Sequence, residues 1–186
     1  MTLEERFPVG QEFDPSRMTE REYIEDLYQI FLNDLVSRPL LWKSGGKEVS
    51  LRRQPEVEGR HAIFWHIITG GGGSEESRQI EHERCVRLRW VRILVELFNE
   101  EFPEEREIRW WIDQRRASNP RYVITRPQFD YIVVIEPRAE YALLVTAYFA
   151  ERQHRRRKLR RDHDGFWERQ EPPKEWTAPD TPSTPG

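Results

Sequence analysis

Residues 121–148, RYVITRPQFDYIVVIEPRAEYALLVTAY, hold three apolar runs separated by two short polar links. The runs 121–125, 130–136 and 141–148 are rich in β-branched and aromatic residues, which is typical of strands. The links RPQF and PRAE are short, and this favours antiparallel pairing of neighbouring strands. With EIRWWI (107–112) as an additional strand, the stretch predicts an antiparallel meander.

The chain before this meander is expected to be mainly helical. A helix is predicted to begin at Thr19, which can cap it, and to end at Ser37, because apolar residues recur at helical spacing between them. A second helix is predicted over 79–99 with its own apolar stripe. The segment 47–53 resembles a short strand, whereas 61–69 fits either a strand or a buried helix.

The element order predicts an α+β fold: N-terminal helices, then a roughly four-stranded antiparallel sheet, then a C-terminal basic helix. We expect an irregular lead-in over 1–17 and a single domain over 18–165. A disordered, proline-rich tail is predicted over 166–186, because five prolines fall in its last fifteen residues.

Charge is unevenly distributed along a chain whose formal net charge is only −3. Residues 1–40 carry nine acidic and four basic side chains, whereas 151–161 carry seven basic side chains and one acidic one. The basic segment can attract a polyanion although the whole protein is slightly acidic. No stretch is apolar enough to span a membrane and no signal peptide is recognised, so a cytoplasmic protein without a membrane partner is expected.

Two histidines and two arginines are candidates for catalysis. His61 and His66 flank an apolar run beside a glycine loop, and imidazole is suited to proton transfer near neutral pH. His66 is preferred because it lies nearer the loop, and the alternative is that either ring is a hydrogen-bonded core residue. Arg84 and Arg87 can share a helix face and hold a phosphate, or they can form ion pairs on a solvated face.

The end of the last strand and the segment after it offer further candidates. Thr146 and Tyr148 fall on one strand face and can donate to phosphate oxygens, or they can simply pack there. The candidate RNA-binding residues are Arg155, Arg156, Arg157, Lys158, Arg160 and Arg161. Leu159 is almost the only apolar residue inside this basic segment, so the segment is not expected to serve core packing. The alternatives to RNA binding are a solvated surface and a contact with an acidic protein.

The sequence predicts neither a metal nor a cofactor. The histidines lack metal-ligand spacing, Cys85 is the only cysteine, and no phosphate-binding glycine loop or nucleophile motif is present. Asp130, Glu136 and Arg138 match a metal-nuclease arrangement only weakly, because arginine stands where lysine is expected.

GRHAIFWHIIT (59–69), RCVRLRWVR (84–92) and DYIVVIEPRAEYALLVTAYFAERQHRRRKLRR (130–161) together resemble a known group of enzymes. They are similar to phage- and toxin-associated members of the barnase, EndoU, colicin-tRNase and RelE-like ribonuclease superfamily, over residues 59–162. The resemblance implies a metal-independent ribonuclease of α+β fold, acting as a toxin and often held by an antitoxin or immunity protein.

The resemblance also implies roles for particular residues. The catalytic histidine would fall on His66 or His61, the arginine on Arg84 or Arg87, and the strand hydroxyl on Thr146 or Tyr148. Glu136 is the nearest counterpart of barnase's acidic base, and the match is not close.

The expected activity is endonucleolytic RNA cleavage through attack of the 2′-hydroxyl, which leaves a 2′,3′-cyclic phosphate. The alternative is a non-catalytic module that binds nucleic acid or protein through its C-terminal basic helix.

Overall fold

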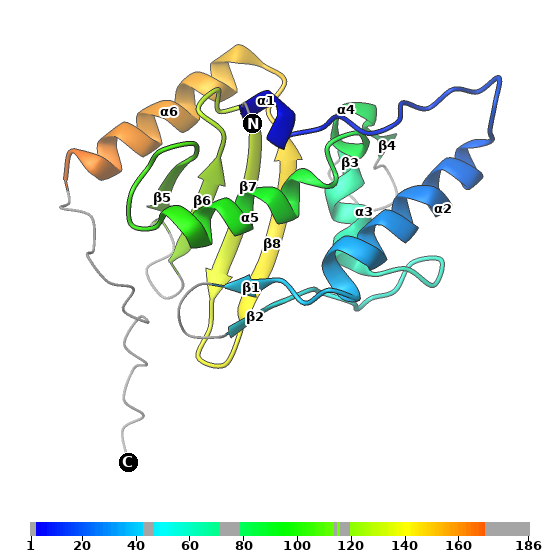
Figure 1. Cartoon of the computed structure of the whole chain (residues 1–186), viewed down its shortest axis with the longest axis horizontal. Coiled ribbons are helices and arrows are strands. Elements are labelled where there is room, and N and C mark those ends of the chain that lie inside the picture. Colours follow the sequence, from blue (N-terminus) through cyan, green and yellow to red (C-terminus); the bar gives the residue numbers. More distant parts are fainter. Residues whose placement is uncertain (1–2, 43–46, 71–78, 114, 116–119, 170–186) are drawn as a thin grey trace.

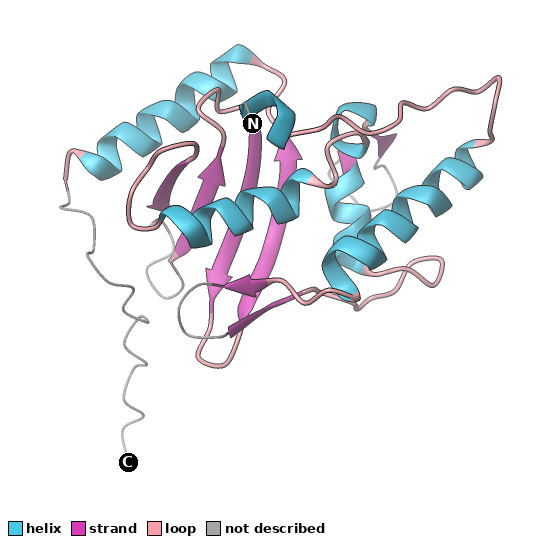
Figure 2. Cartoon of the chain, viewed as in Figure 1, coloured by secondary structure: helices cyan, strands magenta, loops and turns pink. Residues whose placement is uncertain are grey.

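A computed structural model describes residues 3–42, 47–70, 79–113, 115 and 120–169 of the chain, which adopts an α+β fold (Figures 1 and 2). Its main feature is a six-stranded mixed sheet of order β1-β2-β8-β7-β6-β5. Among the described residues, no helix is both long enough and apolar enough to cross a membrane.

The predicted meander forms one side of this sheet. Its strands are β5 (Arg109–Asp113), β6 (Arg121–Thr125), β7 (Tyr131–Pro137) and β8 (Ala142–Phe149). Each pairs antiparallel with the next along the chain. A register shift between Val134 and Ile135 marks a bulge in the β7–β8 pair. Their β-branched and aromatic residues therefore form strands as expected.

The prediction of a four-stranded antiparallel sheet is wrong in size and type. β1 (Leu41–Trp42) and β2 (Lys47–Ser50) extend the sheet beyond β8, and β2 runs parallel to β8 with Val49 opposite Ala142. The outer edge of β8 would otherwise expose unpaired backbone groups, and β2 satisfies part of that edge. The strand predicted over 47–53 is thereby confirmed in its first four residues.

The first long helix begins and ends as its sequence predicts. In α2 (Glu20–Phe31), the Thr19 hydroxyl accepts a hydrogen bond from the Glu22 backbone N–H, and the Glu22 carboxylate accepts one from the Thr19 backbone N–H at 2.8 Å. A π-helical stretch, η1 (Leu32–Val36), continues it to the cap at Ser37. The lead-in before α2 is partly ordered, because α1 (Leu3–Arg6) precedes Phe7, which is buried against Trp90 at a ring separation of 5.4 Å.

Residues 61–69, which fit a strand or a helix equally, form α3 (Ala62–Ile68). The helix is favoured because Ile63, Phe64, Ile67 and Ile68 then fall on neighbouring parts of one face, and all four are fully buried. The following β3 (Thr69–Gly70) pairs with β4 (Gln79–Ile80). Most of the glycine loop lies outside the described residues.

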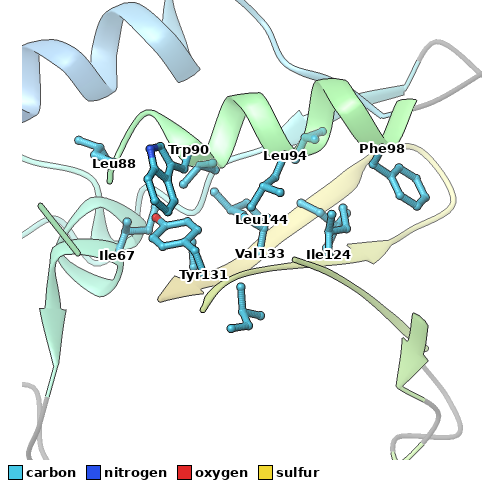
Figure 3. Close-up of a cluster of buried hydrophobic side chains, with 14 of the residues drawn as sticks. Ile67, Leu88, Trp90, Leu94, Phe98, Ile124, Tyr131, Val133 and Leu144 are labelled. Carbon is cyan, nitrogen blue, oxygen red and sulfur yellow. The ribbon is translucent and has the colours of Figure 1, made fainter. Parts of the chain in front are cut away.

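The single helix predicted over 79–99 is instead three elements. After β4, the chain forms a short α4 (His82–Cys85) and then α5 (Trp90–Glu101). α5 crosses one face of the sheet, where Leu94 and Phe98 lie over Val133, Leu144 and Ile124 (Figure 3). α3 packs beside β8 and α4, at the edge that β2 leaves open. This arrangement places α4 close to the end of β8.

The basic segment forms α6 (Gln153–Trp167), which is a longer and better anchored helix than expected. Leu159, His163 and Phe166 are buried, and the Trp167 indole N–H donates to the Trp110 carbonyl at 2.8 Å. Leu159 is therefore not the only anchor, and the predicted tail 166–186 begins too early. Its remaining part, 170–186, lies outside the described residues.

Candidate active site

A cleft of about 550 Å³ is lined by residues of α4, the end of β8 and the start of α6. It joins two sequence segments, 81–84 and 149–155, that the fold brings together. Its lining residues are Glu81, His82, Glu83, Arg84, Phe149, Glu151, Arg152, His154 and Arg155. Two imidazoles and three guanidinium groups therefore border one cavity, although only Arg84 and Arg155 were singled out by sequence.

Arg84 is held rigidly at the cleft wall. Its Nε donates to the Glu81 carboxylate and its Nη1 donates to the Thr69 carbonyl at 2.5 Å, and the side chain is only 14% exposed. Gly70 makes room for this pair, because a Cβ there would lie 1.6 Å from Glu81 Oε1 and 2.8 Å from Arg84 Nη2. A guanidinium fixed in this way can donate to an anion without reorganising first.

His82 is the first residue of α4 and is exposed to solvent. Its ring stacks on Phe13, with 5.6 Å between centroids and 9° between planes, so its orientation is constrained by the ordered N-terminal segment. An exposed imidazole held by a ring contact retains both nitrogens for proton exchange with a ligand. Local spacing does not single out His82, because its role depends on His154, which follows seventy-two residues later in the chain.

The start of α6 supplies further lining residues of the cleft. Arg152 caps the helix, and His154 and Arg155 follow it, all three exposed. The Arg155 guanidinium lies 4.4 Å above the Tyr148 ring, which sets its position. Within the described part of the chain, neither Arg152 nor His154 has an ion pair or side-chain hydrogen bond. Their polar atoms are therefore open to a ligand.

Arg87, the other candidate clamp, has a structural environment. Its Nη1 donates to the Glu83 carboxylate at 2.6 Å and to the Glu83 carbonyl at 2.8 Å. Its guanidinium lies over the rings of Phe149 and Trp90, at 4.3 and 5.0 Å. Arg87 does not line the cleft but supports Phe149, which does. The structure thus separates two arginines that the sequence could not distinguish.

The two histidines proposed from sequence lie elsewhere on α3. His61 precedes the helix, and its Nδ1 lies 2.9 Å from the Tyr28 hydroxyl. Burial, followed by the nearby Arg53 charge, lowers the pKa of His61 and favours its neutral form. His66 is half-buried in the last turn of α3. Neither ring lines the cleft, so His61 fits the core-histidine alternative, and catalysis by His66 stays a prediction.

Thr146 and Tyr148 share one face of β8, as predicted. They stand opposite Val134 and Ile132 in β7, and both are half-buried. Ala147 and Phe149 alternate with them and point to the other face. Phe149 lines the cleft, whereas Thr146 and Tyr148 lie on the other face of β8, where the Tyr148 ring contacts the cleft residue Arg155.

Of the six basic residues proposed to bind RNA, four contact other described residues, and two are exposed without an ion pair to any of them. Arg156 donates from Nε to the Ala150 carbonyl at 2.6 Å, Arg160 lies over the Phe129 ring, and Arg155 stacks as described. Lys158 pairs with Asp162 at 2.8 Å. Arg157 and Arg161 are exposed, with no ion pair to any described residue. The docked arginines use their side chains to attach α6 while their charge stays at the surface.

No metal centre is evident among the described residues. They contain no group of three or more His, Cys, Asp or Glu side chains placed to hold an ion. Asp130 pairs with Arg126 at 3.0 Å, and Glu136, only 2% exposed, is held by Arg121 at 2.7 Å and by Arg138. Both carboxylates are paired with arginines. Because Glu136 is also buried, it lacks the solvent access that a general base requires.

Comparison of the chain with protein-family models, with curated proteins and with solved structures finds no match. Its function is therefore inferred from its own residues and their geometry.

Proposed function

We propose that this protein is a metal-independent endoribonuclease whose active site is the cleft between α4 and α6. The observation that carries the proposal is the meeting of His82 and His154 with Arg84, Arg152 and Arg155 around one cavity. Two proton-transfer groups and a set of anion-binding donors are what the reaction requires, and here they come from segments far apart in the sequence.

RNA carries its own nucleophile, the 2′-hydroxyl. Cleavage therefore needs a base that takes the proton of this hydroxyl and an acid that protonates the departing 5′-oxygen. One imidazole that is neutral and one that is protonated supply these roles near neutral pH. His82 comes from α4 and His154 from α6, and both line the cleft, so each can serve one of these two roles. The product on the 3′ end of the upstream fragment is a 2′,3′-cyclic phosphate.

The arginines stabilise the charge that develops on the phosphate. Arg84 is fixed by Glu81 and by the Thr69 carbonyl, so its donors are preorganised. Glu81 and Glu83 are engaged by Arg84 and Arg87, and no described carboxylate pairs with Arg152 or Arg155. These two guanidinium groups are therefore available to pair with the negatively charged phosphate of the substrate.

The exposed cations of α6 extend this surface beyond the cleft. Arg157 and Arg161 project from the same helix that carries His154, and they can contact phosphates flanking the cleavage site. Such contacts increase affinity for every sequence alike, because phosphates carry no sequence information. The helix thus joins the catalytic cleft to a general RNA-binding surface.

The proposal is tested by substituting the two histidines singly in assays of RNA cleavage with chelator present. His82→Gln and His154→Gln should each lower the cleavage rate by about 10²-fold or more, the scale of lost general acid–base catalysis. RNA affinity should change little. His61→Gln is the matched control, because His61 lies outside the cleft, and it should leave the rate unchanged per folded molecule.

His66→Ala distinguishes the cleft from the sequence-based assignment. Loss of activity in His66→Ala, with normal activity in both cleft variants, would place catalysis on α3 instead. RNA binding by the unmodified protein without any cleavage would favour the binding-module alternative.

A further inference from the structure

A second cavity lies at the other end of α6, and nothing in the proposed chemistry uses it. It measures about 410 Å³, within the range of small-molecule sites. Its lining residues are Trp111, Ile112, Asp113, Arg115, Asp162, Phe166 and Arg169. They come from β5, from Arg115 just after it, from the last turns of α6, and from Arg169 just beyond α6.

The cavity has mixed chemistry and no net charge. Asp113 and Asp162 balance Arg115 and Arg169, while Trp111 and Phe166 form an apolar floor. Arg115 is held by two hydrogen bonds to Asp113, at 2.8 and 2.7 Å, yet its side chain is 67% exposed. A neutral planar group with its own donors and acceptors matches this lining.

The cavity and the cleft lie along one face of α6. Arg155, Asp162 and Phe166 are spaced i, i+7 and i+11, which places them nearly in line on a helix. At about 1.5 Å per residue, the axial distance from Arg155 is about 10 Å to Asp162 and about 16 Å to Phe166. With about 3.4 Å between stacked bases, a single strand would cover that distance in at most about five nucleotides.

From these observations we propose that this cavity binds one unpaired base of the single-stranded RNA whose backbone occupies the cleft. This inference rests on the proposed function. Asp162 is the specificity residue. Its Oδ2 accepts from Lys158 Nζ at 2.8 Å and lies 3.9 Å from Arg115 Nη2, and its Oδ1 can accept from an exocyclic amino group. The exposed Arg115 guanidinium offers a flat cation on which the base stacks. Bases with an exocyclic amino group are therefore favoured over uracil.

The test is binding of fully 2′-O-methylated oligonucleotides, which cannot be cleaved through a 2′-hydroxyl. A uridine decamer is compared with decamers that carry one adenosine, cytidine or guanosine. At least one of these substitutions should raise affinity by about tenfold, the scale of one carboxylate–base contact. In Asp162→Ala, which removes both carboxylate oxygens, this advantage should fall to about twofold or less. The matched control Arg157→Gln, on the same helix outside the cavity, should weaken all the decamers equally.

Equal affinity for all the decamers, or an advantage that persists in Asp162→Ala, would overturn the inference, as would failure to bind RNA. Cleavage of ordinary RNA in chelator without base preference would refute the base site alone. Base-dependent binding without cleavage would support the site and refute the enzyme proposal.

Discussion

Replacing Phe166 by alanine should show that α6 is part of the folded core rather than an attached basic arm. Phe166 is 4% exposed and its ring packs against Trp110 and Trp167, with centroids 5.8 and 5.7 Å away. Loss of a buried phenyl group costs about 3–5 kcal/mol, because the transfer term and the remaining cavity add. We expect the lower end, about 3 kcal/mol, since a site in a last helical turn can partly collapse.

The measurement is urea denaturation followed by circular dichroism. With a slope of about 2 kcal/mol per molar urea, a loss of 3 kcal/mol moves the midpoint by about 1.5 M. Arg161→Ala, on an exposed position of the same helix, is the control and should change stability by less than about 0.5 kcal/mol. A Phe166→Ala midpoint as close to the parent as that of the control would show that α6 contributes nothing to cooperative folding.

Two further substitutions test buried charges. Both ring nitrogens of His163 contact carboxylates, Glu105 at 2.9 Å and Asp164 at 2.8 Å. Burial alone would lower the pKa of His163, but the hydrogen bonds to these two carboxylates outweigh burial and raise the pKa. The contribution of His163 to stability is therefore complete below the unfolded-state pKa of about 6.5, and it is lost as pH rises through the higher folded-state pKa. Between pH 6 and 8 the difference in stability between the parent and His163→Gln should shrink, and a constant difference would contradict this. Glu136→Gln should destabilise the protein by at least about 2 kcal/mol in the same urea assay. The expected loss is smaller than for a fully buried ion pair, because both flanking arginines reach solvent. An unchanged midpoint would show that the ion pairs contribute nothing.

The meander could be predicted because its local signals and its tertiary environment agree. β-branched residues in runs such as 130–136 form strands wherever short links force antiparallel neighbours. The α2 start was equally local, because Thr19 and Glu22 lie within one capping motif. Such features need no knowledge of distant residues.

Local sequence was not sufficient where distant contacts decide. Six of the seven residues over 62–68 are apolar, so the strand-or-helix alternative stayed open, and packing against β8 and α4 makes them helical. β2 joins the sheet through a parallel contact with β8, which no local pattern encodes. α6 looked unanchored because its arginines pack through their side chains on rings such as Tyr148.

The candidate site shows the same limit. Arg84 and Arg155 could be singled out from charge spacing, but His82 and His154 become partners only after α4 and α6 meet at the end of β8. Local sequence favoured His66 and His61, beside the glycine loop, over two histidines in charged surroundings. The sequence of either segment alone does not indicate that His82 and His154 line the same cleft.

End-group analysis of RNA incubated with the purified protein in chelator tests the central claim most directly. The account predicts fragments that end in 2′,3′-cyclic phosphate, and no cleavage of the same strand with 2′-deoxy sugars, because the substrate's own hydroxyl is the nucleophile. Intact RNA in chelator, with cleavage appearing only after magnesium is added, would contradict it.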